Sequence, residues 1–228
     1  MKRQRMKWFD KKLSRVSNQY WHDRSDLLYF QYVDFLVRVV GRNAQSILDV
    51  GSNSCPCLEW FHWIPNKFSI DIQDPYHSWK VRGKKIDFLK YTNNREFDLC
   101  LCLQVLEHIH DARNFAQKLL KVAHHVIVSV AYRWPVGFDS RHVQDPVDEE
   151  KLFTWFNLVP SYQIVVTEPI TEKRRLICYY DRDNPTEKLG IGDLQTRLIR
   201  TPIRASRKGY GQRIALAAQR LFWRSWQN

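Results

Sequence analysis

Several features that would narrow the class of protein are missing from this chain of 228 residues. No apolar run approaches the roughly 18 residues that a membrane-spanning helix needs, so we expect no transmembrane segment. Residues 1–12 are basic but lack the apolar stretch of a secretory signal, and we expect a cytoplasmic protein. Internal repeats and low-complexity linkers are absent as well, which favours one domain with a large core.

Cysteine pairs with the spacing of a zinc or redox site are also absent. Cys55 and Cys57 are separated by one residue instead of two, and Cys100 and Cys102 alternate with leucines on an apparent strand. We expect Cys100 and Cys102 to pack in the core. All five cysteines are expected to be reduced, which fits a reducing compartment.

Acidic residues are absent after Asp193, and the formal net charge of the chain is +12. Such a charge favours an anionic partner, although a basic and inert surface is the alternative. Residues 190–228 form a basic amphipathic extension that suits an anionic membrane surface, at the inner face of the membrane, or a nucleic acid. A terminal helix docked on the domain with solvated arginines is the other interpretation.

The remaining sequence alternates short apolar runs with amphipathic segments, which is typical of an α/β protein. It divides into a basic segment and helix over 1–45, a core domain over 46–182 and the extension over 183–228. Strands are predicted over 46–51, 67–72, 85–89, 97–103 and 125–132, with an antiparallel hairpin of 162–167 and 175–180. Helices are predicted over 23–40, 111–122 and 148–156, with a stunted crossover helix over 57–63.

Two carboxylates follow the first two predicted core strands. Asp49 ends the first strand, Gly51 opens the turn after it, and Asp71 ends the second strand 22 residues later. A carboxylate at the position of Asp71 suits a ribose diol. The turn contains one glycine and no G-x-G-x-x-G pattern, and Asp49 would repel a pyrophosphate but suits a cationic amino-acid group. The sequence therefore indicates a nucleoside with a cationic end rather than a dinucleotide.

Three segments carry a resemblance to a known family. Residues 49–53 resemble the first motif of the class I S-adenosylmethionine-dependent methyltransferases, and residues 96–109 resemble the fourth strand of that family and the turn after it. The hairpin over 162–180 resembles the antiparallel last strand of the family. The resemblance covers residues 46–181 and implies a Rossmann-like fold: a central, mostly parallel seven-stranded sheet with an antiparallel last strand and helices on both faces.

The resemblance also implies S-adenosylmethionine as the cofactor and assigns residues to it. Asp49 and Gly51 would line the methionine end with the backbone of the next residues, and Asp71 would hold the ribose. The further cofactor residues that it implies are Ser52, Asn53, Ile72, Asp87, Phe88, Leu103 and Gln104. Asn53 stands where the family has a second glycine, and we expect it to adopt the left-handed conformation that Asn tolerates.

The residues that would act on the acceptor are His108 and His142, since a histidine can take a proton from an oxygen nucleophile near neutral pH. Gln104, Glu107, His108 and His142 also resemble a metal-binding set of some relatives, among them small-RNA terminal 2′-O-methyltransferases. Because the first member is a neutral Gln, we assign no metal ligand. The predicted function is methyl transfer to a small-molecule, lipid-linked or saccharide acceptor, with an RNA methyltransferase or a non-catalytic domain as alternatives.

Overall fold

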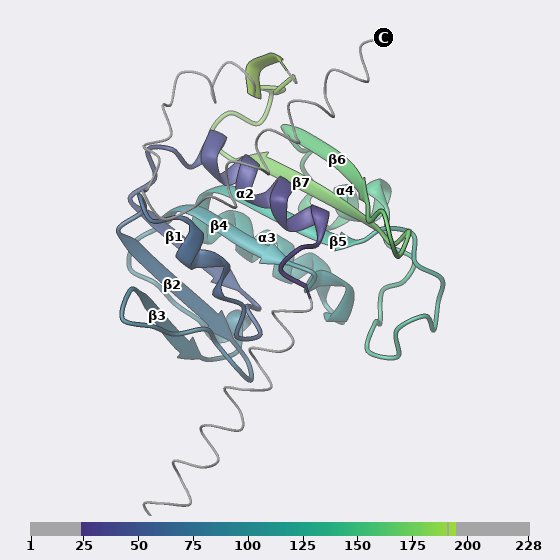
Figure 1. The fold of residues 1–228 in the computed structure, drawn as a ribbon, viewed down its shortest axis with the longest axis horizontal. Coiled ribbons are helices and arrows are strands. Elements are labelled where there is room, and N and C mark those ends of the chain that lie inside the picture. Colours follow the sequence, from purple (N-terminus) through teal and green to yellow (C-terminus); the bar gives the residue numbers. More distant parts are fainter. Residues whose placement is uncertain (1–23, 191, 195–228) are drawn as a thin grey trace, which may run out of the picture.

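The computed structural model describes residues 24–190 and 192–194, which form a seven-stranded sheet flanked by helices (Figure 1). The strand order is β3-β2-β1-β4-β5-β7-β6. The sheet is mostly parallel, with β7 antiparallel to both β5 and β6, as expected. The strands are β1 (Ser46–Val50), β2 (Asn66–Asp71), β3 (Val81–Lys85), β4 (Phe97–Leu103), β5 (Ala123–Ala131), β6 (Tyr162–Thr167) and β7 (Arg174–Asp181).

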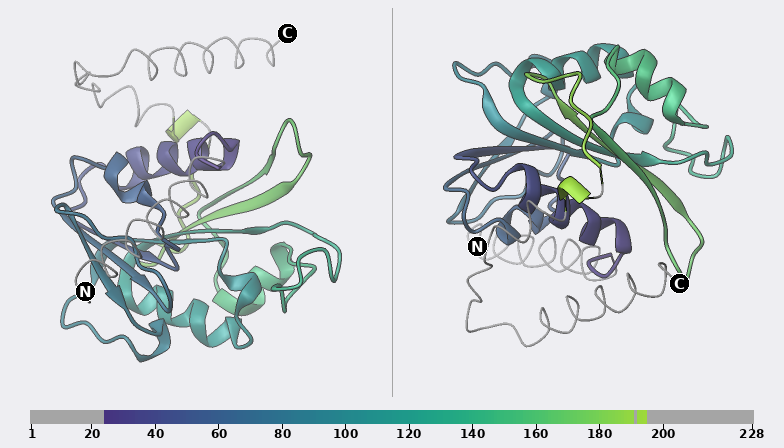
Figure 2. Two further views of the ribbon diagram at one scale, coloured as in Figure 1. Left: turned by 60° about the horizontal axis from the view of Figure 1, so that its bottom comes forward. Right: turned by 90° about the horizontal axis from the view of Figure 1, so that it is seen from above.

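Within residues 24–190, three α-helices cover the two faces of the sheet. They are α2 (Leu28–Val40), α3 (Ala112–Val122) and α4 (Glu149–Phe156). The left view of Figure 2 shows α2 on one face and α3 and α4 on the other. Each face has its own apolar cluster, and the central strands β1, β4 and β5 contribute to both because they are buried on both sides. Cys100 and Cys102 lie in one of these clusters, which confirms that they pack in the core.

Aspartates cap the starts of α3 and α4. The Asp111 carboxylate accepts a hydrogen bond from the Asn114 amide, and the Asp148 carboxylate accepts one from the Lys151 amide. The sequence also favours an Asp or Ser cap for the helix predicted over 23–40, and this prediction is wrong. Leu27 is the N-cap of α2 and gives no side-chain hydrogen bond, so the first amides of this helix find their acceptor elsewhere in the sequence.

The third predicted strand is also wrong. The strand is Val81–Lys85 rather than 85–89, and Phe88–Lys90 forms a short 3-10 turn, η2. The apolar residues of 85–89 suggested a strand because they are buried, and Phe88 does pack in the core from the turn. By contrast β3 lies at the edge of the sheet, where four of its five residues are exposed and no apolar run is needed.

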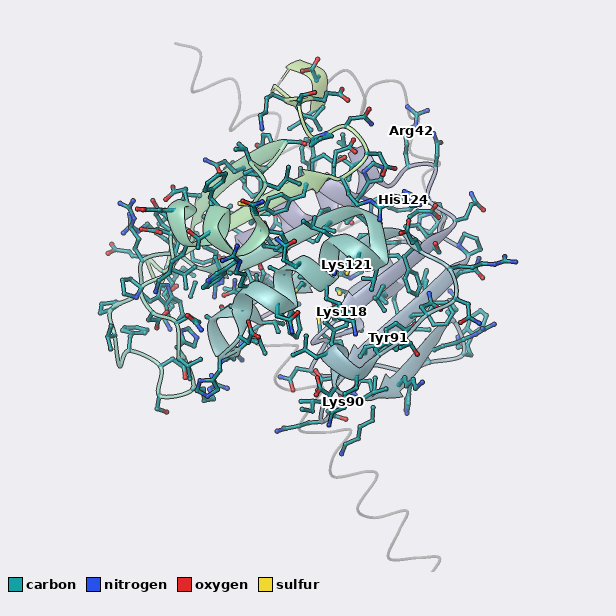
Figure 3. The ribbon with its side chains drawn as sticks, turned by 180° about the vertical axis from the view of Figure 1, so that it is seen from behind. Arg42, Lys90, Tyr91, Lys118, Lys121 and His124 are labelled. Atoms are coloured by element: carbon teal, nitrogen blue, oxygen red, sulfur yellow. The ribbon has the colours of Figure 1, made fainter. Side chains whose placement is uncertain are left out.

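The stretch of chain between β1 and β4 contains no α-helix, and its crossover connections are short. η1 (Pro56–Trp60), a 3-10 turn, replaces the expected stunted helix between β1 and β2. On the other face, the Lys118 ammonium of α3 donates to the carbonyls of Leu89 and Tyr91 at 2.8 and 2.6 Å. Figure 3 shows Lys118 beside Tyr91 and Lys90 at this junction. The connection after β3 is therefore fastened to α3.

The remaining expectations concern the two ends of the chain, membrane spans and the cysteines. The basic residues 1–19 and most of the extension over 183–228 lie outside the described residues. Within the described part of the chain, no helix combines the length and apolar character that crossing a bilayer requires. All five cysteines are free thiols, as predicted.

Candidate active site

The turn after β1 has no room for a side chain at its first position. Gly51 has a φ of +81°, and a Cβ built there would lie 2.4 Å from Cγ2 of Val105. Asn53 has a φ of 43° and Ser54 a φ of 58°, so the left-handed conformation expected of Asn53 is present. The turn thus runs close to the carboxyl end of the neighbouring strand β4, and the amides of Gly51 and Ser54 donate to the carbonyls of Ile70 and Asp74.

Asp71 holds this turn from the end of β2. One carboxylate oxygen accepts from the Asn53 amide at 2.9 Å, and the other accepts from the amides of Gln73 and Asp74 at 2.7 and 3.0 Å. Ser52 adds a second link between this turn and β2, because its hydroxyl accepts a hydrogen bond from the hydroxyl of Ser69. Asp71 and Ser52 therefore fix the relative position of the two strand ends, as a rigid ligand cradle requires.

Asp49 is 2% exposed at the end of β1, and the Cys57 thiol donates to it at 3.5 Å. Burial raises the pKa of Asp49 to about 7, the thiol lowers it, and the nearby Asp71 raises it. A buried carboxylate with so few donors is stabilised in its charged form by a cation. Asp49 therefore suits an ammonium or sulfonium group.

The other predicted cofactor residues differ in how they can act. Ile72 is 65% exposed just after β2, where a flat ligand can pack on it. The Asp87 carboxylate accepts from the Leu89 amide and caps η2. Phe88 is 4% exposed and its ring lies 4.8 Å from that of Phe115, so only its backbone can contact a ligand. Leu103 ends β4 and is half-buried.

Gln104 follows β4 with a φ of 56°, and its side chain is fully engaged by neighbours. Its amide nitrogen donates to the Ser129 hydroxyl, and its amide oxygen accepts from Nε of Arg175. Gln104 therefore does not belong to the group of side chains that can bind a metal. Its backbone remains at the carboxyl edge beside the Gly51 turn, where the resemblance places the methionine end.

Glu107, His108 and His142 come together beyond the end of β4. One ligand atom from each lies within 4.8 Å of the other two. Glu107 is fully buried, with Oε1 accepting from the Ala131 amide and Oε2 without a hydrogen-bond partner. Burial raises the pKa of Glu107 to about 7. A buried unpaired oxygen is costly, and a proton or a cation would satisfy it.

The two histidines are oriented by their Nδ1 atoms. Nδ1 of His108 lies 3.0 Å from the Arg141 carbonyl, and Nδ1 of His142 lies 2.7 Å from the Asp145 carboxylate. Since both partners are acceptors, each Nδ1 carries the hydrogen and each Nε2 keeps a lone pair in the neutral ring. Burial lowers the pKa of His108, which favours this neutral form. The cluster can therefore accept a proton or coordinate a divalent cation.

Sequence reasoning missed the residues that support this cluster. Trp134 stacks on His142 with ring centroids 5.4 Å apart, and Asp145 anchors the same ring from three residues further on. Arg175 and Glu168 join the cofactor edge to α2. The spacing of His142 and Asp145 was visible in the sequence, but nothing local distinguished it from a surface turn. The other contacts depend on which strands are adjacent.

Strand order, the Gly51 turn and the paired acids define a class of protein. The described chain has the Rossmann-like fold of the class I S-adenosylmethionine-dependent methyltransferases, as its likeness to their solved structures shows. No protein-family model and no curated protein sequence matches the chain.

Three solved structures illustrate this likeness. The 1,6-didemethyltoxoflavin-N1-methyltransferase of Burkholderia thailandensis, solved with S-adenosylhomocysteine, is 15% identical with a TM-score of 0.55, covering 75% of this chain and 88% of that one. NodS, an N-methyltransferase of Bradyrhizobium japonicum solved with the same ligand, is 14% identical with a TM-score of 0.53, covering 68% and 87%. A methyltransferase of Clostridium acetobutylicum is 14% identical with a TM-score of 0.53, covering 74% and 97%.

Proposed function

We propose that this protein is an S-adenosylmethionine-dependent methyltransferase that methylates a hydroxyl group of a small-molecule, lipid-linked or saccharide acceptor. The observation that carries the proposal is the pair of acids at adjacent strand ends. Asp49 is buried and suits the cationic methionine end, and Asp71 rigidly holds the turn where the ribose would lie. The two solved N-methyltransferases with S-adenosylhomocysteine have the same fold.

Methyl transfer needs mainly alignment, because the sulfonium already activates the methyl group. The acceptor oxygen forms the new bond to the methyl carbon as the carbon–sulfur bond breaks, which leaves neutral S-adenosylhomocysteine. The proton of the hydroxyl goes to a base beside the donor site. His108 and His142 can supply that base, because each ring is fixed through Nδ1 and directs Nε2 away from that partner; Nε2 of His142 lies 3.9 Å from the Asp139 carboxylate.

The experiment that tests the proposal measures binding and transfer with the full chain. Calorimetry with S-adenosylhomocysteine should give a saturable signal, and labelled S-adenosylmethionine should transfer its methyl group to a component of a lysate. Asp49→Asn and Asp71→Asn should each weaken binding at least about tenfold. Asp74→Asn, an exposed acid on the same turn, is the matched control and should leave binding unchanged. Binding without transfer to any component would favour the non-catalytic alternative.

A second candidate is a metal-assisted form of the same reaction, although the sequence led us to assign no metal. Glu107, His108 and His142 fit a divalent cation, because one ligand atom of each lies within 4.8 Å of the other two and Oε2 of Glu107 has no hydrogen-bond partner. A bound cation would polarise the acceptor hydroxyl. In this form Asp145 is a positioning residue that holds His142 as a ligand.

The metal-assisted form predicts loss of transfer in EDTA and recovery with an added divalent ion. A thermal shift with Mn²⁺ or Zn²⁺ gives a readout independent of activity, and Glu107→Gln and Asp145→Asn should abolish or reduce that shift. Asp148→Asn, which removes a carboxylate of the same loop that is not in the cluster, should preserve it. Transfer that is insensitive to EDTA would leave the histidines as the base.

We also propose that the protein is cytoplasmic. The free thiols support it, because the described cysteines form no disulfide and four of the five are buried.

A further inference from the structure

A cavity lies at the end of the sheet opposite the candidate active site. Its volume is about 360 Å³, and it is lined by the amino ends of β2 and β3 and the loops before them. Strand register separates the two sites: Lys67 pairs with Val81 near the cavity, and Asp71 pairs with Lys85 at the carboxyl edge. Four residues of strand correspond to about 13 Å, so the cavity is distinct from the methyl-donor site.

The lining of this cavity is basic. Its charged or titratable residues are His62, Lys67, Lys80 and Arg82, and it contains no carboxylate. By contrast, the described residues as a whole are nearly balanced, with 21 Lys and Arg against 22 Asp and Glu. The positive character is therefore a local property of this corner of the sheet.

Lys67 is the most informative residue of the cavity. It is 4% exposed, and its ammonium has no hydrogen bond or ion pair with any residue that the structure describes. Burial lowers its pKa, Glu59 raises it and the nearby Lys80 lowers it. The stem of Lys67 is therefore packed in the sheet, while its ammonium reaches solvent at the cavity without a described partner. An anionic group in the cavity would pair with it.

The nearest acid does not serve as this partner. Glu59 accepts hydrogen bonds at Oε1 from the Tyr76 and Ser78 hydroxyls, which hold it against the loop before β3. No ion pair between Glu59 and Lys67 occurs within 4.0 Å. Lys67 is therefore left for a group from outside the described chain.

Trp79 gives the cavity a flat apolar surface beside its cations. The side chain is 89% exposed, and Nζ of Lys80 lies 4.6 Å from the ring centroid. Arg82 likewise lies over the ring of Phe68, at 5.3 Å, and neither cation is paired with a described carboxylate. An exposed tryptophan with adjacent unpaired cations is the arrangement that binds a nucleotide, with the base on the ring and the phosphate on the cations.

We propose that this cavity binds the phosphate group of a nucleotide, free or within a nucleic-acid strand, with the base stacked on Trp79. Lys67 and Lys80 would each donate to phosphate oxygens, and the phosphate would supply the partner that the Lys67 ammonium lacks. The site does not rest on the proposed methyltransferase function, because it shares no residue with the candidate active site.

The test is calorimetry on the full chain with S-adenosylhomocysteine present, so that the candidate donor site is not available to the probe. The probes are uridine monophosphate, uridine and a five-residue oligouridylate. We expect uridine to bind much more weakly than its phosphorylated forms. Binding of the monophosphate identifies a free nucleotide as the ligand, and binding of the oligonucleotide alone identifies a nucleic-acid strand.

Variants locate the binding. Lys67→Met and Trp79→Ala should each lower the affinity for the bound probe at least about fivefold. Lys80→Gln should lower the affinity and also reduce its dependence on salt concentration. The controls are Lys188→Gln and Ile170→Ala, which remove an exposed cation and an exposed apolar side chain elsewhere. If Lys67→Met fails to fold in a thermal unfolding assay, the exposed positions 79 and 80 decide the question. Equal binding by these variants and the wild type, or no binding of either phosphorylated probe, would overturn the proposal.

Discussion

At the scale of single residues, Gly51 is the position with least freedom. Its positive φ excludes most side chains, and Val105 occupies the place of a Cβ. Asn53 two residues later shows that the turn tolerates a side chain where the space is open, since it adopts a left-handed conformation while exposed. Contact with Val105 therefore adds to the backbone strain at position 51, and the two together make glycine necessary there.

Gly51→Ala should lower the free energy of unfolding by about 2–4 kcal/mol, because backbone strain and overpacking against Val105 add together. Gly137→Ala is a matched control: Gly137 has a φ of +80°, and a Cβ added there would meet no neighbouring atom within 4 Å. The control should cost only about 1 kcal/mol of strain. Urea unfolding of both variants measures the difference, and equal losses would show that Val105 moves aside freely.

Two buried carboxyl groups give the protein a pH dependence. Burial raises the pKa of Asp49 and of Glu107 to about 7, so the folded chain holds their protons more tightly than the unfolded chain does. Their contribution to stability is complete below about pH 4 and is lost as the pH rises through 7. Without ligand, Asp49→Asn should therefore match the wild type at pH 4 and exceed it at pH 8 by on the order of 2 kcal/mol.

Urea unfolding of the ligand-free chain at several pH values measures this effect. Asp74→Asn is the control, because it removes an exposed carboxylate instead of a buried one. A variant Asp49→Asn with the wild-type slope would show that Asp49 is solvated in the folded chain. The same variant should bind S-adenosylhomocysteine poorly, so stability and ligand affinity move in opposite directions.

At the scale of elements, the hairpin of β6 and β7 fastens α2 to the sheet. Glu168, 2% exposed in the turn of this hairpin, accepts from the amides of Leu28 and Tyr29 at 2.8 and 3.1 Å. The same carboxylate pairs with Arg175 at 3.2 Å. Glu168, which is 139 positions away from Tyr29, thus accepts the hydrogen bonds of the first amides of α2, because the residues just before α2 supply no side-chain cap.

Glu168→Gln should destabilise the protein by about 2–4 kcal/mol, because it leaves the buried Arg175 without its counter-charge and weakens the cap of α2. Glu172→Gln, an exposed position in the same turn, should be nearly neutral. Thermal unfolding compares the two variants. Similar melting temperatures for both would mean that α2 is held by its apolar face alone.

At the scale of the whole molecule, the excess of positive charge lies outside the described residues. The described residues are nearly neutral, and residues 195–228 contain eight Arg and Lys and no acid. Removal of these 34 residues should lower the salt concentration at which the protein elutes from heparin, since fewer counterions are released. Replacement of four exposed cations in the described part, such as Lys188, should have a smaller effect. An unchanged elution position would assign polyanion binding to the remaining chain.

The sequence alone determined the parts of the fold that rest on local patterns. The apolar runs of β4 and β5, the Asp caps of α3 and α4, and the hairpin of β6 and β7 were all predictable, because each depends on side chains a few residues apart. Asp49, Gly51 and Asp71 were identifiable for the same reason, since they follow recognisable strands. The edge strand β3 was not, because an exposed edge needs no apolar pattern.

Only the tertiary structure decided what these residues meet. The crowding of Gly51 by Val105, the cluster of Glu107 with two histidines, and the capping of α2 by Glu168 all join segments that are distant in sequence or separated by a turn. The isolation of Lys67 in a basic cavity is also a property of the packed sheet. The physical reason is that burial and partner choice depend on strand order, which no local spacing encodes.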